Sequence, residues 1–287
     1  MKKEFKLFVF FALFVSFFLG SCSRIDVATN FADTYIAAQL DKYFDINSIQ
    51  SEFVKKSLKH DIVSIRRIIF PKAADELEKV LKENDEIRTW NKDIFMAHEK
   101  SMKEIFYSSI KILEHSAVEF TSQLKPEQLK AFQKEFRKKT EDIQELVDDP
   151  KKSREKRFDK TRKFIEGWIG SLTNGQKKDL QNFCQLHLFP YREQIQNREK
   201  LSKGFADAFP DLEKRKQYVS ELFLNYENLR DPQYTSVVLE DQDKLMDFIV
   251  KLANSMNDDQ RNHLRSTLKD RIKQLRESAT GSGKHWF

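Results

Sequence analysis

Apolar residues recur along most of the chain at helical spacings, with charged residues between them. Ile105, Ile110 and Leu113 are one example, and Leu222 and Leu229 are another. Such spacing places apolar side chains on one face of a helix, and no stretch alternates as a strand would. Glycine and proline are scarce, at 7 and 6 residues in 287, while 33% of the residues are charged. The pattern predicts an all-α protein of about ten helices.

One short pattern occurs four times: an aliphatic residue, a polar residue, two variable residues and glutamine. Its copies are Ile46–Gln50, Leu124–Gln128, Leu172–Gln176 and Met256–Gln260. Asn or Thr at the second position suits a helix N-cap, and glutamine three residues later can bond back to the N–H of the cap. In the second copy Lys125 is a poor cap, but Pro126 suits the first helical position. The predicted cap residues are Asn47, Gln50, Gln128, Thr173, Gln176, Asn257 and Gln260.

The spacing of the motifs indicates two tandem halves. From Ile46 to Leu124 is 78 residues, and from Leu172 to Met256 is 84. Phe70-Pro71 and Phe189-Pro190 follow the first motif of each half and predict helix stops there, because the residue before proline resists the helical conformation. The alternative to two tandem halves is four ordinary capped helices.

The predicted segments are a signal peptide 1–21, a lipidated tether 22–30, helical halves 31–149 and 150–276, and a flexible tail 277–287.

The first 22 residues have the layout of an export signal. A basic start is followed by the uncharged stretch 7–19, which is too short for a hydrocarbon core that takes about 20 residues to span. Leu19-Gly20-Ser21-Cys22 then resembles the bacterial lipobox, which implies cleavage before Cys22 and anchoring in a lipid bilayer through acyl chains on it. An uncleaved anchor with a chance cysteine is the alternative. Ser23, in place of Asp, favours the outer membrane, facing the periplasm, over the inner membrane.

Charge narrows the range of partners. The net charge is +6, and residues 1–21 hold three lysines and one glutamate, so the mature chain is near +4. Export argues against nucleic acid as a partner. Residues 151–163 hold eight Lys or Arg against two acidic residues. They are either a solvated helix start or a patch for an anionic partner, formed by Lys151, Lys152, Arg154, Lys156 and Arg157.

Signals for catalysis are weak. His98-Glu99 begins like a zinc-protease motif but Met102 stands where the second histidine belongs. Cys184 occupies an apolar position of its motif helix and is predicted to be a core thiol. We therefore expect no enzyme, metal or cofactor. The 25 phenylalanines are expected mainly in the core, with some available to line an apolar binding surface.

The repeated motif resembles the LTxxQ motif of the Spy and CpxP periplasmic proteins, which Leu172–Gln176 matches fully. Those proteins carry two motifs per chain and dimerise into a thin, curved helical cradle. The resemblance implies an elongated or curved fold of two tandem Spy-like halves. Residues 35–50 and 157–176, with Trp168 before the third motif, also resemble an uncharacterised family of proteobacterial lipoproteins.

These observations lead to two functional hypotheses. The first is an ATP-independent chaperone or envelope-stress binding protein, whose partners are unfolded envelope proteins. The second is a structural or regulatory lipoprotein that binds one dedicated envelope partner. A chaperone needs exposed apolar patches rimmed by charge, whereas a dedicated partner needs one complementary patch.

Overall fold

The structure, a computed structural model, describes residues 29, 31–87 and 89–281. The predicted signal peptide 1–21, Cys22 and the tail beyond Gly281 lie outside the described residues, as does the tether apart from Thr29. The regular structure of the described residues is entirely helical, which confirms the all-α prediction. None of the described helices is both long and apolar enough to cross a membrane.

Eleven helices make up the described chain. The first four are α3 (Ala32–Phe44), α4 (Ser48–Glu86), α5 (Lys92–Ser122) and α6 (Pro126–Asp148). The other seven are α7 (Pro150–Ile169), α8 (Asn174–Leu186), α9 (Tyr191–Ala208), α10 (Leu212–Leu224), α11 (Tyr226–Leu229), α12 (Pro232–Asn254) and α13 (Asp258–Thr280). Beyond the four motifs, Asn or Asp side chains accept N–H bonds at four further helix starts, as N-caps do. These caps are Asn91, Asp149, Asp211 and Asp231.

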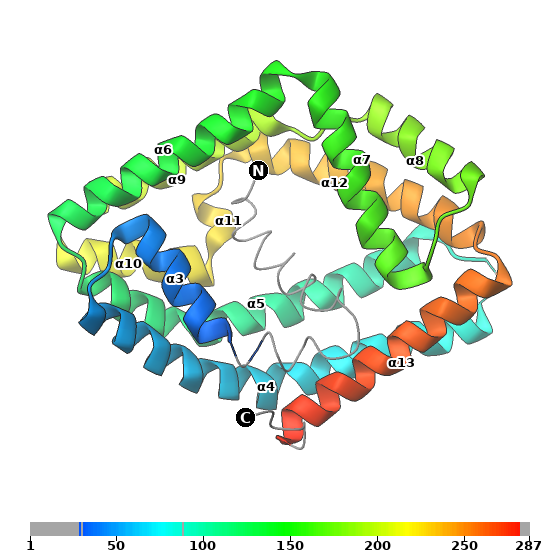
Figure 1. The fold of residues 1–287 in the computed structure, drawn as a ribbon, viewed down its shortest axis with the longest axis horizontal. Helices are drawn as coiled ribbons and strands as arrows, with labels where there is room; N and C mark the ends of the chain where they lie inside the picture. The colour runs from blue at the N-terminus through cyan, green and yellow to red at the C-terminus, as the bar shows by residue number, and fades with distance from the viewer. Residues whose placement is uncertain (1–28, 30, 88, 282–287) are drawn as a thin grey trace.

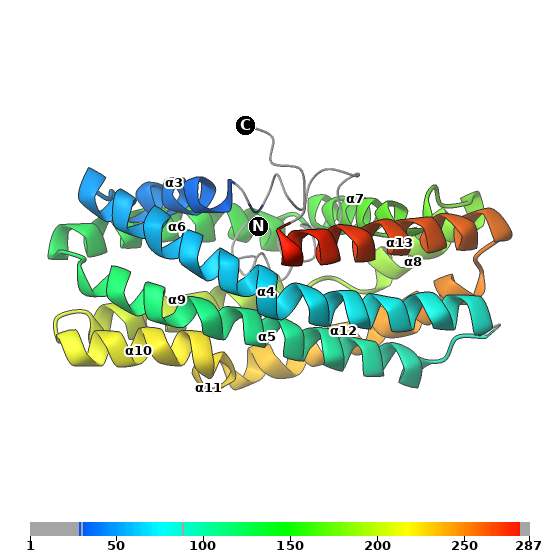
Figure 2. The ribbon, with the colours of Figure 1, turned by 90° about the horizontal axis from the view of Figure 1, so that it is seen from below.

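The helices are arranged around an elongated, flattened outline (Figure 1). On one long side, α4 is packed against both α5 and α13, and on the other α6 is packed against α9. Seen edge on, α3, α7 and α13 lie along one edge, whereas α10 and α11 lie along the opposite edge (Figure 2). Because α13, the last described helix, packs on α4, the second described helix, the end of the described chain contacts its beginning.

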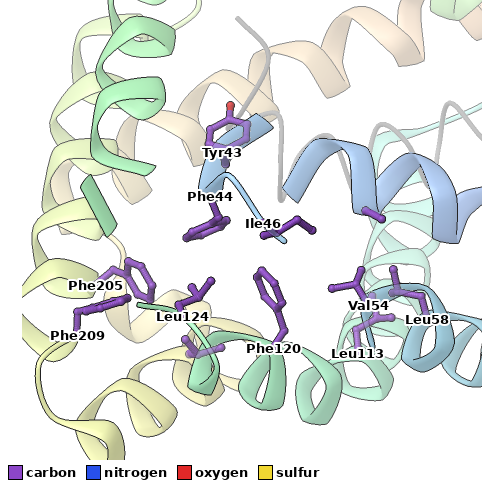
Figure 3. Close-up of a cluster of buried hydrophobic side chains, with 12 residues drawn as sticks. Tyr43, Phe44, Ile46, Val54, Leu58, Leu113, Phe120, Leu124, Phe205 and Phe209 are labelled. Atoms are coloured by element: carbon purple, nitrogen blue, oxygen red, sulfur yellow. The ribbon is translucent and has the colours of Figure 1, made fainter. Parts of the chain in front are cut away.

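Three clusters of buried apolar side chains hold this frame together. The first is rich in aromatic rings: Phe44 meets Phe120 edge-on with ring centroids 5.7 Å apart (Figure 3). Phe44 also stacks on the partly buried Phe132, at 5.1 Å. The second joins α4 and α5 to α13, and the third joins α7 and α8 to α12. Phe205 and Phe209 lie in the first cluster as well, so these phenylalanines are core residues, as expected.

The helix stop predicted at Phe70-Pro71 is wrong. α4 continues through Pro71 to Glu86, and it changes direction near its middle (Figure 2). Proline removes one backbone hydrogen bond and crowds the preceding turn. Here Phe70, Ala73 and Ala74 are buried in the second cluster, and this packing outweighs the local penalty. At Phe189-Pro190 the prediction is right, because α8 ends at Leu186 and α9 begins at Tyr191.

The predicted start of the flexible tail at residue 277 is also wrong. α13 runs on to Thr280, and Ser278 is buried. Gly281 then ends the helix in the left-handed conformation, at φ 69°, and its N–H bonds to Glu277 O. Glycine adopts this conformation without a steric penalty, which makes it a common helix terminator. Burial of Leu275 and Ser278 keeps the last turn folded.

Candidate functional site: two glutamine-bridged junctions and a groove with exposed leucines

The four motifs begin the four helices α4, α6, α8 and α13. In three of them the side chain of Asn47, Thr173 or Asn257 accepts from the N–H of the glutamine three residues later. The glutamine Oε1 in turn accepts from the N–H of the cap residue. Lys125 has no side-chain acceptor, so α6 keeps only the second bond, from Lys125 N–H to Gln128 Oε1 at 3.0 Å.

At the first junction the glutamines of α4 and α6 bond to each other. Gln50 Nε2 donates to Gln128 Oε1 at 3.0 Å, and Gln128 Nε2 donates to Gln50 Oε1 at 2.9 Å. Each Nε2 also donates to the backbone carbonyl of the residue just before the opposite motif, Gln123 O and Asp45 O respectively. Both side chains are buried. Because each Oε1 also accepts from its cap N–H, the hydrogen-bonding capacity of both amides is filled.

The second junction repeats this arrangement with α8 and α13. Gln176 Nε2 donates to Gln260 Oε1 at 3.0 Å, and the reverse bond is 2.8 Å long. The carbonyls that complete it are Ser255 O and Ser171 O. In all four motifs this carbonyl belongs to the residue five positions before the opposite glutamine.

The pairing of the glutamines is the part of the site that sequence reasoning missed. A capping role accounts for the hydrogen bond of each glutamine to the start of its own helix. It does not account for the bonds that each glutamine also makes to a second helix. The signal was the near-equal separation of the motifs in each pair, 78 and 84 positions. A repeated polar residue at a position next to apolar core residues indicates a buried partner, because an unpaired buried amide is costly.

The predicted basic patch is only partly a surface feature. Lys151 and Lys152 are exposed, and Lys152 pairs with Glu145 at 2.7 Å. Arg154 and Lys156 are half-buried. Arg157 is buried: its Nη2 lies 2.8 Å from Asp241 Oδ1.

Assigning Arg157 to a patch for an external partner is therefore wrong. Its guanidinium carbon also lies 4.8 Å from the ring centroid of Phe183. Arg157 faces inward from α7, where the carboxylate of α12 and the ring of α8 compensate the burial of its charge. The remaining patch consists of Lys151, Lys152, Arg154 and Lys156.

His98 lies in a network of charged groups between α4 and α5. Its Nδ1 is 2.7 Å from Glu76 Oε1, and its Nε2 is 2.5 Å from Glu83 Oε2. Ser101 and Lys79 also donate to Glu76. Burial lowers the pKa of His98, but its hydrogen bonds to the two carboxylates outweigh that effect and raise the pKa above its usual value. The histidine of the incomplete zinc-protease motif thus links two helices, and the described residues contain no grouping of side chains suited to a metal ion.

Cys184 is buried beside α12 in the third cluster. Burial raises the pKa of its thiol to about 11. A nucleophilic cysteine needs a lowered pKa and access to solvent, so the described environment is that of a core residue, as the sequence predicted.

A groove of about 270 Å³, lined by both apolar and polar residues, opens between the end of α8 and the start of α9. Its apolar lining consists of Leu186, Leu188 and Pro190 together with Val237 of α12. Its polar lining consists of His187, Glu240, Asp241 and Lys244. Leu186 is 77% exposed and Leu188 42%. These two leucines give the groove an exposed apolar contact surface.

The fold and junctions define the class: an all-α protein whose two ends are each fastened by a buried pair of glutamines. The chain belongs to the DUF6279 family, a family of unknown function, which matches residues 42–235. The match includes the first three motifs and ends before the fourth. No curated protein and no solved structure matches the chain.

Proposed function

We propose that the protein is an outer-membrane lipoprotein, acylated on Cys22, that binds protein segments in the periplasm without turnover. In this proposal it acts as an ATP-independent chaperone or an envelope-stress binding protein. The lipobox-like sequence supports the anchor. The groove at Leu186 and Leu188 supports the binding function, and it is the observation that carries the proposal.

The motif junctions support the comparison with Spy and CpxP. Each half of the chain holds two motifs, and the two glutamines of a half are bonded to each other. We propose that the chain consists of two tandem Spy-like halves. The junctions lock the helix starts, so an apolar surface can stay exposed without loss of the surrounding fold.

The groove suits an apolar segment flanked by charge. The leucines supply apolar contact, whereas Glu240 and Lys244, 2.5 Å apart, supply a charged pair in the same lining. Lys151, Lys152 and Lys156 would speed the encounter with acidic segments, an effect that salt screens over about 8 Å at physiological ionic strength. Weak apolar contact combined with charge-guided encounter is what an adaptable binder requires.

The test uses the chain from Ser23 to Phe287, which keeps every described residue. In several-fold excess it should suppress aggregation of two unrelated unfolded proteins without ATP. Leu186→Ser combined with Leu188→Ser should lower this protection. Ile49→Ser should not, although Ile49 is 76% exposed and therefore matches Leu186 in exposure. A chain that protects neither client would refute chaperone function.

The second candidate is a scaffold or regulator with one dedicated envelope partner. The limited volume of the groove, about 270 Å³, favours one short segment over many different clients. A pull-down from the envelope that returns one stoichiometric partner, lost on Leu186→Ser with Leu188→Ser, would support this candidate instead.

The anchor has its own test. Metabolic labelling with an alkyne fatty acid should mark the full chain and should be lost in Cys22→Ser. Continued labelling of that variant would refute acylation at Cys22.

A further inference from the structure

The outer side of α3 carries aromatic side chains in contact with solvent. Phe31, which caps the helix, is 65% exposed, and Tyr35, one turn further on, is 52% exposed. Ala38 and Lys42 continue this side and are exposed too. Ala37, on the other side, is buried in the first cluster. We call Phe31, Tyr35, Ala38 and Lys42 the outer stripe of α3. A helix that buries one side and exposes aromatic rings on the other has two contact surfaces.

A basic run on α4 lies beside the start of α3. Residues 55–67, KKSLKHDIVSIRR, hold five Lys or Arg against one Asp. Lys59 Nζ is 3.8 Å from Asp33 Oδ2, and the guanidinium of Arg66 donates to the hydroxyl of Thr29. These two contacts place the basic run next to the helix that carries the outer stripe.

The apolar surface extends onto α4 between these contacts. Val63 stands one turn after Lys59 and is 61% exposed. Lys59 itself keeps 74% of its side chain exposed despite its ion pair. α4 therefore exposes an aliphatic and a basic side chain beside α3, whose aromatic side chains lie on the outer stripe.

The position of Cys22 limits how far this surface can lie from a bilayer. Cys22 stands seven positions before Thr29, and seven extended residues span at most roughly 24 Å. If Cys22 is acylated, which is part of the proposed function, Thr29 lies within that distance of the lipid, and α3 begins three residues later.

We propose that the outer stripe of α3 and the basic run of α4 form a second contact with the membrane, on a bilayer of anionic lipid. Phe31 and Tyr35 insert at the level of the headgroups, where aromatic rings are favoured. The basic residues of the run face the lipid phosphates. A soluble protein client would not account for the closeness of the surface to the anchor, whereas a membrane accounts for both the charge and the position.

This contact orients the molecule. α3, α7 and α13 lie along one edge (Figure 2), and that edge faces the bilayer. The long axis then runs along the membrane surface, because this edge extends along that axis (Figure 2).

The first experiment replaces the acyl anchor with an artificial one. The chain from Ser23, preceded by a hexahistidine tag, is held on phosphatidylethanolamine–phosphatidylglycerol vesicles that contain nickel-chelating lipid. An environment-sensitive fluorophore is attached at Tyr35→Cys or, as the control, at Leu186→Cys. The native Cys184 is buried and is expected to stay unlabelled. The fluorophore at position 35 should shift to the blue and be quenched by a lipid-borne quencher, and the one at 186 should not.

The second experiment measures binding of the untagged chain from Ser23 to the same vesicles. Phe31→Ser with Tyr35→Ser should weaken binding roughly tenfold, the effect of losing about one buried aromatic side chain. Leu186→Ser with Leu188→Ser is the matched control and should leave binding unchanged. Salt and neutral phosphatidylcholine should both weaken binding of the native chain.

The inference is overturned if position 35 stays as exposed to water as position 186, or if both serine pairs bind vesicles equally. These outcomes do not depend on Cys22, because the tag takes its place in the first experiment and the chain of the second begins at Ser23. Loss of the proposed function would be seen separately, as missing acylation or as failure to protect clients.

Discussion

Some single residues stabilise more than one helix in this protein, and the motif glutamines are the clearest case. Each caps its own helix and also bonds a second helix. At the second junction, the Gln176 and Gln260 amides are both buried, so neither can turn to water if its partner is removed. A buried amide left without partners costs about 1 to 3 kcal/mol.

We predict that Gln176→Leu and Gln260→Leu each lower the free energy of unfolding by about 2 kcal/mol. The double variant should cost less than the sum of the two, by about 1 kcal/mol, because the second replacement removes a group that the first has already left unsatisfied. Urea denaturation of the four proteins measures this. Gln144→Leu, at an exposed position of α6, is the control and should change stability by less than about 0.5 kcal/mol. Additive losses would contradict a direct bond.

His98 should make stability depend on pH. Its pKa is raised above 6.5 in the folded protein, so its contribution is complete below pH 6.5 and is lost as the pH rises through the folded pKa. Burial raises the pKa of Glu76, but hydrogen bonds to His98, Lys79 and Ser101 outweigh it and lower the pKa below 4.5. The contribution of Glu76 is therefore present above pH 4.5 and is lost as the pH falls through the lowered pKa.

We expect the unfolding free energy of the native chain to fall as the pH rises above 6.5, and to fall more steeply than that of His98→Gln, which cannot become charged. Denaturation at a series of pH values tests this. His115→Gln, at an exposed position of α5, is the matched control and should follow the native profile. Parallel profiles for His98→Gln and the native chain would show that His98 is not the group that titrates.

At the scale of elements, the sequence predicted where helices start better than where they end or which helices pack together. Starts depend on local chemistry, and Asn47, Thr173 and Asn257 carry it in their own side chains. The continuation of α4 past Pro71 depends on burial of Phe70 against helices distant in sequence. The inward orientation of Arg157 depends on Asp241, 84 positions away. Local patterns do not contain such contacts.

The turn between α7 and α8 offers a test of backbone geometry. Gly170 has φ 75° and ψ −162°, a conformation open almost only to glycine. A Cβ there would also lie 3.3 Å from the ring of His263. Gly170→Ala should therefore lower stability by about 2 to 3 kcal/mol in thermal or urea unfolding.

Gly175→Ala is the matched control, because Gly175 lies inside α8 and a Cβ would meet nothing nearer than Thr173 Oγ1 at 4.0 Å. It should be neutral or gain up to about 1 kcal/mol through helix propensity. Equal losses in the two variants would mean that the turn does not require glycine.

At the scale of the whole molecule, the packing of α13 on α4 closes the frame. Leu275 and Ile69 are fully buried in the cluster that joins them. On the surface, Arg276 pairs with Asp75 and Glu78, each at 2.9 Å. The sequence predicted α13 as a helix but held no signal for its partner.

We predict that Leu275→Ala lowers the free energy of unfolding by about 2 to 5 kcal/mol, since it leaves a cavity in the closing contact. Arg276→Ala should cost less than about 1 kcal/mol, because exposed ion pairs contribute little. Hydrogen exchange should show the loss in Leu275→Ala on α4 as well as on α13. Protection loss confined to α13 would argue that the two helices do not stabilise each other.

The closing contact also sets an order of events during synthesis. Asp75 and Arg276 are 201 positions apart, and at 5 to 20 residues per second α13 leaves the ribosome roughly 10 to 40 s after α4. Throughout that interval Ile69, Phe70 and Leu77 lack the part of their cover that α13 provides. Each newly synthesised chain thus passes through a stage at which α4, its longest described helix, exposes apolar side chains that can aggregate or bind a holding chaperone.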